Sequence, residues 1–304
     1  MRTSRRLPIH SHNRTAYAFL LPWLIGFFCL TLGPMLGSLY LSLTKYNLLR
    51  PPEWIGFANF KQIFTNDATF THSLQLTFVY VLLSVPLRII FALLVALALN
   101  KGIRGLGIYR TVYYIPSLLG GSVAISIVWR QIFDSEGVIN AFLGWFGLEG
   151  PAWIANPDYL IYPIVTLSVW QFGSAMVIFL AGLKQVPADL YEASQVDGAG
   201  KIRQFFSISL PMLTPVLFFN LIMSIINSFQ AFTPAYVIGD GHGGPLDASM
   251  FYTLYLYLKG FSYFDMGYAS ALAWIMLLII AVFTGIIFAT SRFWVFYGDG
   301  KGGR

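Results

Sequence analysis

The sequence predicts an all-α membrane protein with six transmembrane helices. Of its 304 residues, 57% are hydrophobic and only 11% are charged, whereas soluble domains carry about 25% charged residues. A chain of this composition cannot supply a polar surface all round, so most of its surface must face lipid. Six apolar stretches are long enough to cross a bilayer as helices: 17–41, 74–99, 113–133, 160–183, 213–238 and 266–288. Strands of a membrane barrel would instead alternate with a period of two.

The first stretch, 17–41, follows a basic tail formed by residues 1–16. A signal peptide has an apolar core of about 7–15 residues and a cleavage site of small residues. Because this stretch is longer and shows no such site, we interpret it as a retained first span. It contains the one cysteine of the chain, Cys29, so no internal disulfide can form.

Basic residues predict the orientation of the spans. With the N-terminus inside, thirteen of the nineteen Lys and Arg residues lie on the cytoplasmic side, five lie outside or at the outer membrane face, and Arg88 lies within a span. The positive-inside rule therefore places both termini in the cytoplasm, including a C-terminal tail of residues 291–304. The same bias explains the net charge of +6 without nucleic-acid binding. We expect one membrane domain, 17–290, whose outer loops 42–73 and 134–159 can fold back over the membrane.

Polar residues within the spans are candidates for a solute pathway, because they are costly in lipid. Arg88, on the second span, lies roughly 16 Å from the inner helix end and is too deep to reach the headgroups easily. The other candidates lie on the fourth and fifth spans: Ser168, Trp170, Gln171, Ser174, Asn220, Ser224, Asn227 and Gln230. Amides and hydroxyls suit the hydroxyls of a sugar, and an aromatic ring suits its C–H face. Hydrogen bonds that hold helices together are the open alternative, and for Arg88 it is a structural pairing within the bundle or with a partner.

The loop 187–210, after the fourth span, is acidic and broken by glycine. Pro187 suits the first position of a helix, which can run through Asp197 before Gly198 ends it. Helices that lie on anionic lipid are usually rich in Lys and Arg. The charges of Glu192 and Asp197 therefore favour a basic protein partner over lipid headgroups, and the small Ala193 allows a close approach.

A second short helix is expected after Gly198. Its apolar spacing puts Ile202, Phe205, Phe206 and Ser209 on one face. Pro211 is expected to close this helix before the fifth span begins.

The same loop resembles the signature of ATP-binding-cassette importer permeases. That signature is Glu-Ala-Ala, three residues, Gly, nine residues, Ile-x-Leu-Pro. The chain has Glu192-Ala193-Ser194, Gly198 and Ile208-x-Leu210-Pro211 at the same spacing, with serine for the second alanine. Flanking segments such as "WIGFANFKQIF" and "YRTVYYIPSLLGGSVAISIVWRQIF" resemble the sugar-importer branch, and within it the first of two permease subunits, as in maltose-, lactose- and glycerol-phosphate-type systems.

This resemblance implies a transmembrane permease subunit of an ATP-driven, binding-protein-dependent carbohydrate importer in the cell membrane, with the MetI-like fold of type I importers. It implies four kinds of partner: a second permease subunit that completes the pore, two copies of an ATP-binding subunit, an extracytoplasmic solute-binding protein and the carbohydrate itself. It also implies that the loop docks on the ATPase and transmits its closure. The loop residues concerned are Leu190, Tyr191, Glu192, Ala193, Ser194, Asp197, Gly198, Ala199, Ile208, Leu210 and Pro211.

The chain shows no motif for chemistry of its own. It lacks the phosphate loop G-x-x-x-x-G-K-[ST], because "GAGKI" and "GDGKGG" miss both the spacing and the hydroxyl. We therefore expect no directly bound cofactor, with ATP hydrolysed by partner subunits. The scattered histidines indicate neither a metal site nor a catalytic base. A self-sufficient secondary transporter would need internal repeats and intramembrane carboxylates, and an intramembrane enzyme would need a catalytic pair within the spans; both remain alternatives.

Overall fold

The computed structural model describes residues 10–102 and 105–296, with side chains from residue 17 onward. Of the predicted tails, residues 1–9 and 297–304 lie outside the described part, as does Arg104. The chain divides into two compact units, Met1–Asn66 with Lys259–Ile275 and Asp67–Leu258 with Met276–Arg304. Each unit is described by itself, and helix α15 (Met266–Trp294) contributes residues to both.

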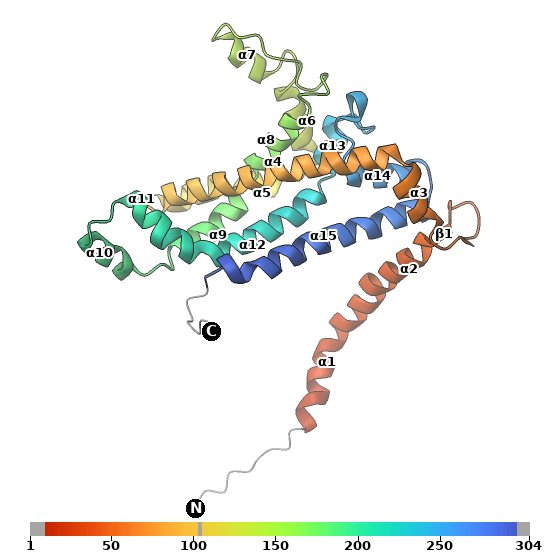
Figure 1. Ribbon diagram of the computed structural model, residues 1–304, viewed down its shortest axis with the longest axis horizontal. Helices are drawn as coiled ribbons and strands as arrows, with labels where there is room; N and C mark the ends of the chain where they lie inside the picture. The colour runs from red at the N-terminus through yellow and green to blue at the C-terminus, as the bar shows by residue number, and fades with distance from the viewer. Residues whose placement is uncertain (1–9, 103–104, 297–304) are drawn as a thin grey trace, which may run out of the picture. The chain divides into compact units, whose positions relative to one another are not determined.

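The first unit begins with a long helix made of α1 (His10–Gly26), the π-helical segment η1 (Phe27–Leu32) and α2 (Gly33–Ser42) (Figure 1). Within it, Tyr17–Ser42 is long and apolar enough to cross a membrane, which confirms the first predicted span. None of the residues in its most apolar window is buried within the chain. This helix therefore offers its side chains to lipid or to another subunit.

A hairpin and a short helix complete the first unit. Strands β1 (Thr44–Lys45) and β2 (Glu53–Trp54) pair antiparallel, and α3 (Ala58–Asn66) follows. The side-chain amide of Asn59 donates to the carbonyls of Ser42 (2.9 Å) and Thr44 (3.0 Å), which ties α3 to the hairpin. A Cβ atom on Gly267 would lie 2.2 Å from the Thr44 carbonyl oxygen, so the start of α15 can approach the hairpin only with glycine there.

The core of the second unit is formed by α4 (Ala68–Leu99), α9 (Gly173–Leu183) and α12 (Leu210–Phe229). The side chain of Asp67 begins α4 by accepting a hydrogen bond from the Phe70 amide (2.8 Å). Ala92 and Ala96 are fully buried on the face of α4 that enters the core. A Cβ atom on Gly182 of α9 would come within 2.9 Å of Leu213 on α12. Small residues at these contacts allow membrane helices to pack closely.

The second unit contains further elements besides this core and its part of α15. They are α5 (Leu106–Leu119), α6 (Val123–Ile132), α7 (Val138–Gly144), α8 (Ile161–Trp170), α10 (Ala188–Val196), α11 (Lys201–Gln204), the π-helical segment η2 (Phe205–Ser209), α13 (Thr233–Ile238), the 3-10 turn η3 (Pro245–Asp247) and α14 (Tyr252–Tyr257). Helix α7 projects from the core helices (Figure 1). The π-helical segment η4 (Leu258–Ser262) lies at the boundary between the two units.

Two predicted spans are not single straight helices. The stretch 113–133 belongs to α5 and α6, which meet at 100°, and 160–183 belongs to α8 and α9, which are bent by 41°. Gly120 and Gly121 interrupt the first pair, and the Ser122 hydroxyl begins α6 by accepting from the Ile125 amide (3.3 Å). In the sequence Gly-Gly-Ser, the two glycines interrupt one helix and the serine caps the next. The apolar content of the stretch, on which the predicted span was based, does not show this interruption. Within the described residues, four helices and two bent pairs are long and apolar enough to span a membrane, six if each pair counts once.

The second helix of the loop is present, but its predicted end at Pro211 is wrong. Segments α11, η2 and α12 run on without a gap, and the Leu210 amide bonds to the Phe205 carbonyl five residues earlier. A wide π turn before the proline shifts the hydrogen-bond pattern where proline has no N–H to donate. The same arrangement precedes Pro34, where the Gly33 amide bonds to the Phe28 carbonyl. Proline therefore sits inside these continuous helices.

The widened turn also disrupts the predicted common face of the second helix. Ile202 and Phe206 are exposed, whereas Ser209 is buried. A π turn adds a residue to the turn, so the spacing of a regular α-helix does not hold across it.

Candidate functional site

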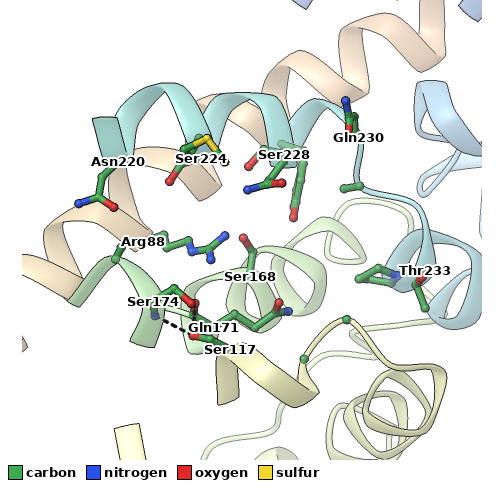
Figure 2. Close-up of a pocket in the computed structure, with 18 of the residues that line it drawn as sticks. Arg88, Ser117, Ser168, Gln171, Ser174, Asn220, Ser224, Ser228, Gln230 and Thr233 are labelled. Atoms are coloured by element: carbon green, nitrogen blue, oxygen red, sulfur yellow. Dashed lines mark hydrogen bonds between the residues drawn. The ribbon is translucent and has the colours of Figure 1, made fainter. Parts of the chain in front are cut away.

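A cavity of about 560 Å³ lies inside the second unit, among α4, α5, α8, α9, α12 and the segment that leads into α13 (Figure 2). Eight of the nine residues predicted as pathway candidates line it: Arg88, Ser168, Gln171, Ser174, Asn220, Ser224, Asn227 and Gln230. The sequence separation of these residues is large, so only the packing of the helices brings them together. Apart from the guanidinium of Arg88, the polar side chains that line the cavity carry amides and hydroxyls, set among apolar groups.

Trp170 is the exception among the predicted pathway residues. It is not part of the cavity lining, and its ring packs on Trp129, with ring centres 5.3 Å apart. Aromatic surface comes instead from Tyr80, Phe219 and Phe232, which line the cavity. The prediction of an aromatic face beside the polar groups therefore holds with different residues.

Three interruptions in the membrane helices of the described chain lie at this cavity. Gly120 and Gly121, between α5 and α6, line it, as does Gln171, between α8 and α9. Residues 230–232, between α12 and α13, line it as well. Backbone that leaves the helical pattern within a membrane is tolerated only where it is buried in protein or lines a water-filled space. The breaks therefore mark the cavity as a polar compartment within the spans.

Ser117 holds the break between α8 and α9 in place. Its hydroxyl donates to the Gln171 carbonyl (3.0 Å) and accepts from the Ser174 amide (3.0 Å), two main-chain groups at the interrupted turn. The neighbouring backbone is packed tightly, because a Cβ atom on Gly120 would lie 2.2 Å from the Gln171 side chain. This wall of the cavity is thus built by close contact between α5 and the broken span.

The polar residues divide into those that hold helices together and those with unused hydrogen-bonding capacity. Ser84 and Ser228 bond to each other (3.3 Å) and join α4 to α12. Asn220 is buried, yet its Nδ2 atom has no hydrogen-bond partner, and neither does the Nε atom of Arg88. A buried polar atom without a partner carries a free-energy penalty. Such atoms indicate a ligand site more than a structural contact.

Some lining residues were missed by reading the sequence. Tyr80 is one of them. It lies eight residues before Arg88 on α4, so the two share a helical face, and extending that face from Arg88 would have identified Tyr80. Phe219 and Met223 adjoin the predicted residues of α12 in the same way. Phe232 and Thr233 carry no such signal, because they line the cavity only as a result of the break before α13.

The predicted acidic loop forms α10, a tight turn and α11 in the second unit (Figure 1). Helix α10 begins at Ala188, so Pro187 lies just before the first helical position and not in it. Gly198 has φ +75°. Its amide bonds to the Gln195 carbonyl (3.0 Å), and the Ala199 amide bonds to the Ser194 carbonyl (2.9 Å). These two bonds form a Schellman cap, so the predicted stop at Gly198 is present.

The side chains of α10 divide into an inner and an outer set. Glu192, Ala193 and Asp197 are exposed, and Val196 is 89% exposed although it is apolar. Tyr191, Ser194 and Ala199 are half-buried. The outer set therefore combines acidic charge, a small residue and apolar surface, a composition suited to contact with another protein.

The inner set of this loop is hydrogen-bonded to the helix that follows. The Tyr191 hydroxyl bonds to the Ser209 hydroxyl (2.8 Å). The Gln204 side-chain amide donates to the Ser194 hydroxyl (2.9 Å), which itself donates to the Tyr191 carbonyl (2.8 Å). Gln204 and Ser209 lie within the predicted loop but were not among the coupling residues implied by the resemblance, and both are buried. The serine that replaces the second alanine of the signature thus contributes to a latch between α10 and α11.

The remaining signature residues lie where η2 passes into α12. Ile208 and Leu210 are half-buried, and Pro211 stands at the start of α12. They fix the path from the loop into a helix that lines the cavity. A continuous helix therefore connects the loop to the cavity wall.

The family described as "Binding-protein-dependent transport system inner membrane component" matches residues 65–293. The probable ABC transporter permease protein YesP of Bacillus subtilis is 52% identical over 290 residues, which cover 95% of this chain and 94% of that protein. The lactose transport system permease protein LacF of Rhizobium radiobacter is 30% identical over 296 residues, with 95% and 98% covered. The arabinooligosaccharides transport system permease protein AraP of Halalkalibacterium halodurans is 31% identical over 279 residues, with 90% and 86% covered.

Solved structures agree on the fold. A chain of a bacterial alginate ABC transporter, in complex with an alginate pentasaccharide-bound periplasmic protein, superimposes with a TM-score of 0.79 at 21% identity, covering 93% of this chain and 95% of its own. At that identity the similarity concerns the arrangement of the helices. It confirms the predicted all-α fold, whose described residues hold four helices and two bent pairs long and apolar enough to span a membrane.

Proposed function

We propose a mechanism for this chain from the premise that it belongs to the family of binding-protein-dependent transport system inner membrane components. As a multi-pass permease subunit of such an importer, it lines part of a path across the membrane. Its cargo is a carbohydrate, and the polar cavity is the part of the path that the cargo occupies. The loop from Pro187 to Leu210 couples this path to an ATP-hydrolysing partner.

The meeting of three helix breaks and a set of neutral polar groups at one cavity carries the proposal. Sugars expose hydroxyls that need amide and hydroxyl partners, and Gln171, Ser224 and Asn227 offer them. The C–H face of a sugar ring packs on aromatic surface, which Tyr80, Phe219 and Phe232 provide. Most of these groups are neutral, which matches the many hydroxyls of a carbohydrate.

Movement reaches the cavity through the continuous helix that starts at the loop. Because Ser209 is bonded to Tyr191 and the chain continues directly into α12, a displacement of α10 is transmitted to the wall that carries Asn220. The exposed carboxylates of Glu192 and Asp197 dock on a basic cleft of the partner. We infer two ATP-binding subunits, because a second permease subunit completes the pore and presents its own loop.

ATP hydrolysis belongs to the partner subunits in this proposal, since the sequence holds no phosphate-binding loop. The excess of basic residues places the loop and both termini in the cytoplasm. An extracytoplasmic binding protein then delivers the cargo to the opposite side. No cofactor is bound by this chain itself.

The test is uptake into proteoliposomes that contain the complete transporter, with binding protein outside and ATP inside. Glu192→Lys should lower uptake by about tenfold or more, because it reverses a charge at the docking face. The matched control is Gln195→Lys, at an exposed position of the same helix, which should stay within about twofold. Uptake that needs neither ATP nor binding protein would refute the proposed function.

Cross-linking tests the docking partner directly. Cys29 is exposed and is the one cysteine of the chain, so a Cys29→Ser background accepts single cysteines. A cysteine at Ala193 should cross-link to the ATP-binding subunit, whereas one at Trp145, just after α7, should not. Cross-links from Ala193 that capture only lipid would contradict the docking role.

A further inference from the structure

Arg88 is the one charged side chain among the described residues that line the central cavity. Figure 2 shows its guanidinium extending from α4 into the space between Ser224 and Ser228 on one side and Ser168 and Ser174 on the other. All other polar lining residues are amides or hydroxyls, which suffice for a neutral sugar. The arginine therefore needs a separate explanation.

The charge of Arg88 is not balanced by the part of the chain that the structure describes. Its Nε atom is buried without a hydrogen-bond partner. No carboxylate is present among the described residues lining the cavity, and the ion pair found in the described chain joins Arg130 and Asp240 elsewhere. A charge removed from water is costly unless it is paired and hydrogen-bonded. Among the described residues Arg88 therefore has no ion-pair partner, and its electrostatic neighbour there is the Tyr80 hydroxyl on the same helix.

A second arginine stands in the adjoining recess. That recess, of about 390 Å³, is lined by Arg110, Thr111, Tyr114, Ser174, Val177 and Ile178, and it shares Ser174 and Ile178 with the central cavity. The Nε atom of Arg110 is also buried without a partner. Two neighbouring compartments thus each hold one guanidinium and no carboxylate among their described lining residues. Two arginines in adjoining compartments suit a cargo that carries negative charge.

We propose that the cargo is an acidic saccharide and that Arg88 selects it by binding its carboxylate. This inference rests on the proposed function, since it assigns a substrate class to the same cavity. A guanidinium binds a planar carboxylate through two parallel hydrogen bonds, and one arginine neutralises one carboxylate. Asn220, whose Nδ2 atom also lacks a partner, lines the same space. Cargo binding satisfies both groups.

The test compares disaccharides that carry one uronate with their neutral methyl esters, using the complete transporter in detergent. Isothermal titration should show that the wild type binds an acid at least about tenfold more tightly than its ester, because charge-assisted hydrogen bonds are the stronger kind. Arg88→Gln should remove this preference, and Arg88→Lys should keep part of it. The matched control is Arg130→Gln, at an arginine already paired with Asp240, and it should retain the wild-type ratio.

Three results would overturn the proposal. One is a wild type that binds esters as tightly as acids, or that binds none of the acids. Another is an Arg88→Gln variant that weakens acid and ester by the same factor. The third is loss of subunit assembly in Arg88→Gln, seen by size-exclusion chromatography, which would mean that Arg88 pairs with a carboxylate of the second permease. In each case, uptake of a neutral saccharide that requires ATP and binding protein would leave the proposed function standing.

Discussion

The loop 187–210, which we propose couples to the ATPase, and the central cavity lie in the same compact unit and are assembled in opposite ways. The loop is one stretch of chain, and its side-chain bonds join residues no more than 18 positions apart. The cavity draws on residues from Tyr80 to Pro234 and on several helices. The loop turns charged and apolar groups outward, whereas the cavity turns polar groups inward.

Because the loop and the cavity are assembled separately, variants in the two regions should cause different defects in transport. A change in the outer face of the loop alters contact with a partner and leaves the cavity residues in place. A change in the cavity alters the affinity for cargo and leaves the docking face in place. The ratio of ATP hydrolysed to cargo moved should therefore respond to loop variants, and the KM for uptake should respond to cavity variants.

Gly198→Pro should have the largest effect. Proline holds φ near −65°, whereas Gly198 has φ +75° and its amide is bonded to Gln195. The conflict of about 3 kcal/mol or more corresponds to a loss of native loop of about 100-fold. ATP-dependent uptake should fall by a similar factor while the protein remains in the membrane.

The control for this variant is Gly200→Pro, two residues further on. Gly200 has φ −71°, which proline adopts without strain. Uptake should then stay within several-fold of the wild type. Equal uptake by both proline variants would show that the turn at Gly198 has no part in coupling, and would remove the contrast between loop and cavity.

Asn220→Leu should have an intermediate effect, stabilising the fold while weakening transport. Leucine is close in size and removes a buried amide nitrogen that has no partner, so the free energy of unfolding should rise by about 1 kcal/mol or more. The KM for uptake should rise about 2–10-fold, because the cargo loses a hydrogen bond. Thermal unfolding in detergent and transport kinetics measure the two quantities.

Thr77→Val provides the structural comparison for Asn220. The Thr77 hydroxyl accepts a buried hydrogen bond from the Tyr252 amide (2.9 Å), away from the cavity lining. This variant should lower the free energy of unfolding and leave the KM within about twofold. If Asn220→Leu behaved in the same way as Thr77→Val, Asn220 would be a structural residue.

Ser194→Ala should have the smallest effect. It restores the second alanine of the signature and removes the bond from Gln204 (2.9 Å), a loss of about 0.5–1.5 kcal/mol. Hydrogen exchange in α10 should become about 2–10-fold faster while uptake stays within about twofold. The control is Ser207→Ala, at an exposed position of the same loop. It should change neither the exchange rate in α10 nor the uptake. A large loss of uptake in Ser194→Ala would show that the latch itself transmits movement.

The two regions also differ in how far the sequence could predict them. The loop was predicted down to the stop at Gly198, because capping and turn formation depend on neighbours within a few residues. The same local reasoning failed at Pro211, since the π turn before it depends on hydrogen bonds that span five residues. The bonds that Gln204 and Ser209 make to α10 were missed for a related reason, because they follow from the way α10 folds back on the helix after it.

For the cavity, the sequence identified most polar residues and could not choose between a pathway and helix contacts. That choice depends on which groups find partners once the helices pack. Ser84 and Ser228 find each other, whereas Asn220 and Arg88 do not. Trp170, predicted as part of the lining, packs against Trp129 of α6, a helix that leaves α5 at 100° after the glycine pair.

By itself, the amino-acid order determined where apolar segments begin and end, the positions of the caps and the signature of the loop. These properties follow from burial in lipid and from hydrogen bonds between near neighbours, which are encoded over a few turns of helix. Only the tertiary structure decided that the interrupted spans meet at one cavity and which buried polar atoms remain without partners. Those outcomes depend on contacts between helices far apart along the chain, where one glycine or one hydroxyl sets how closely two backbones approach.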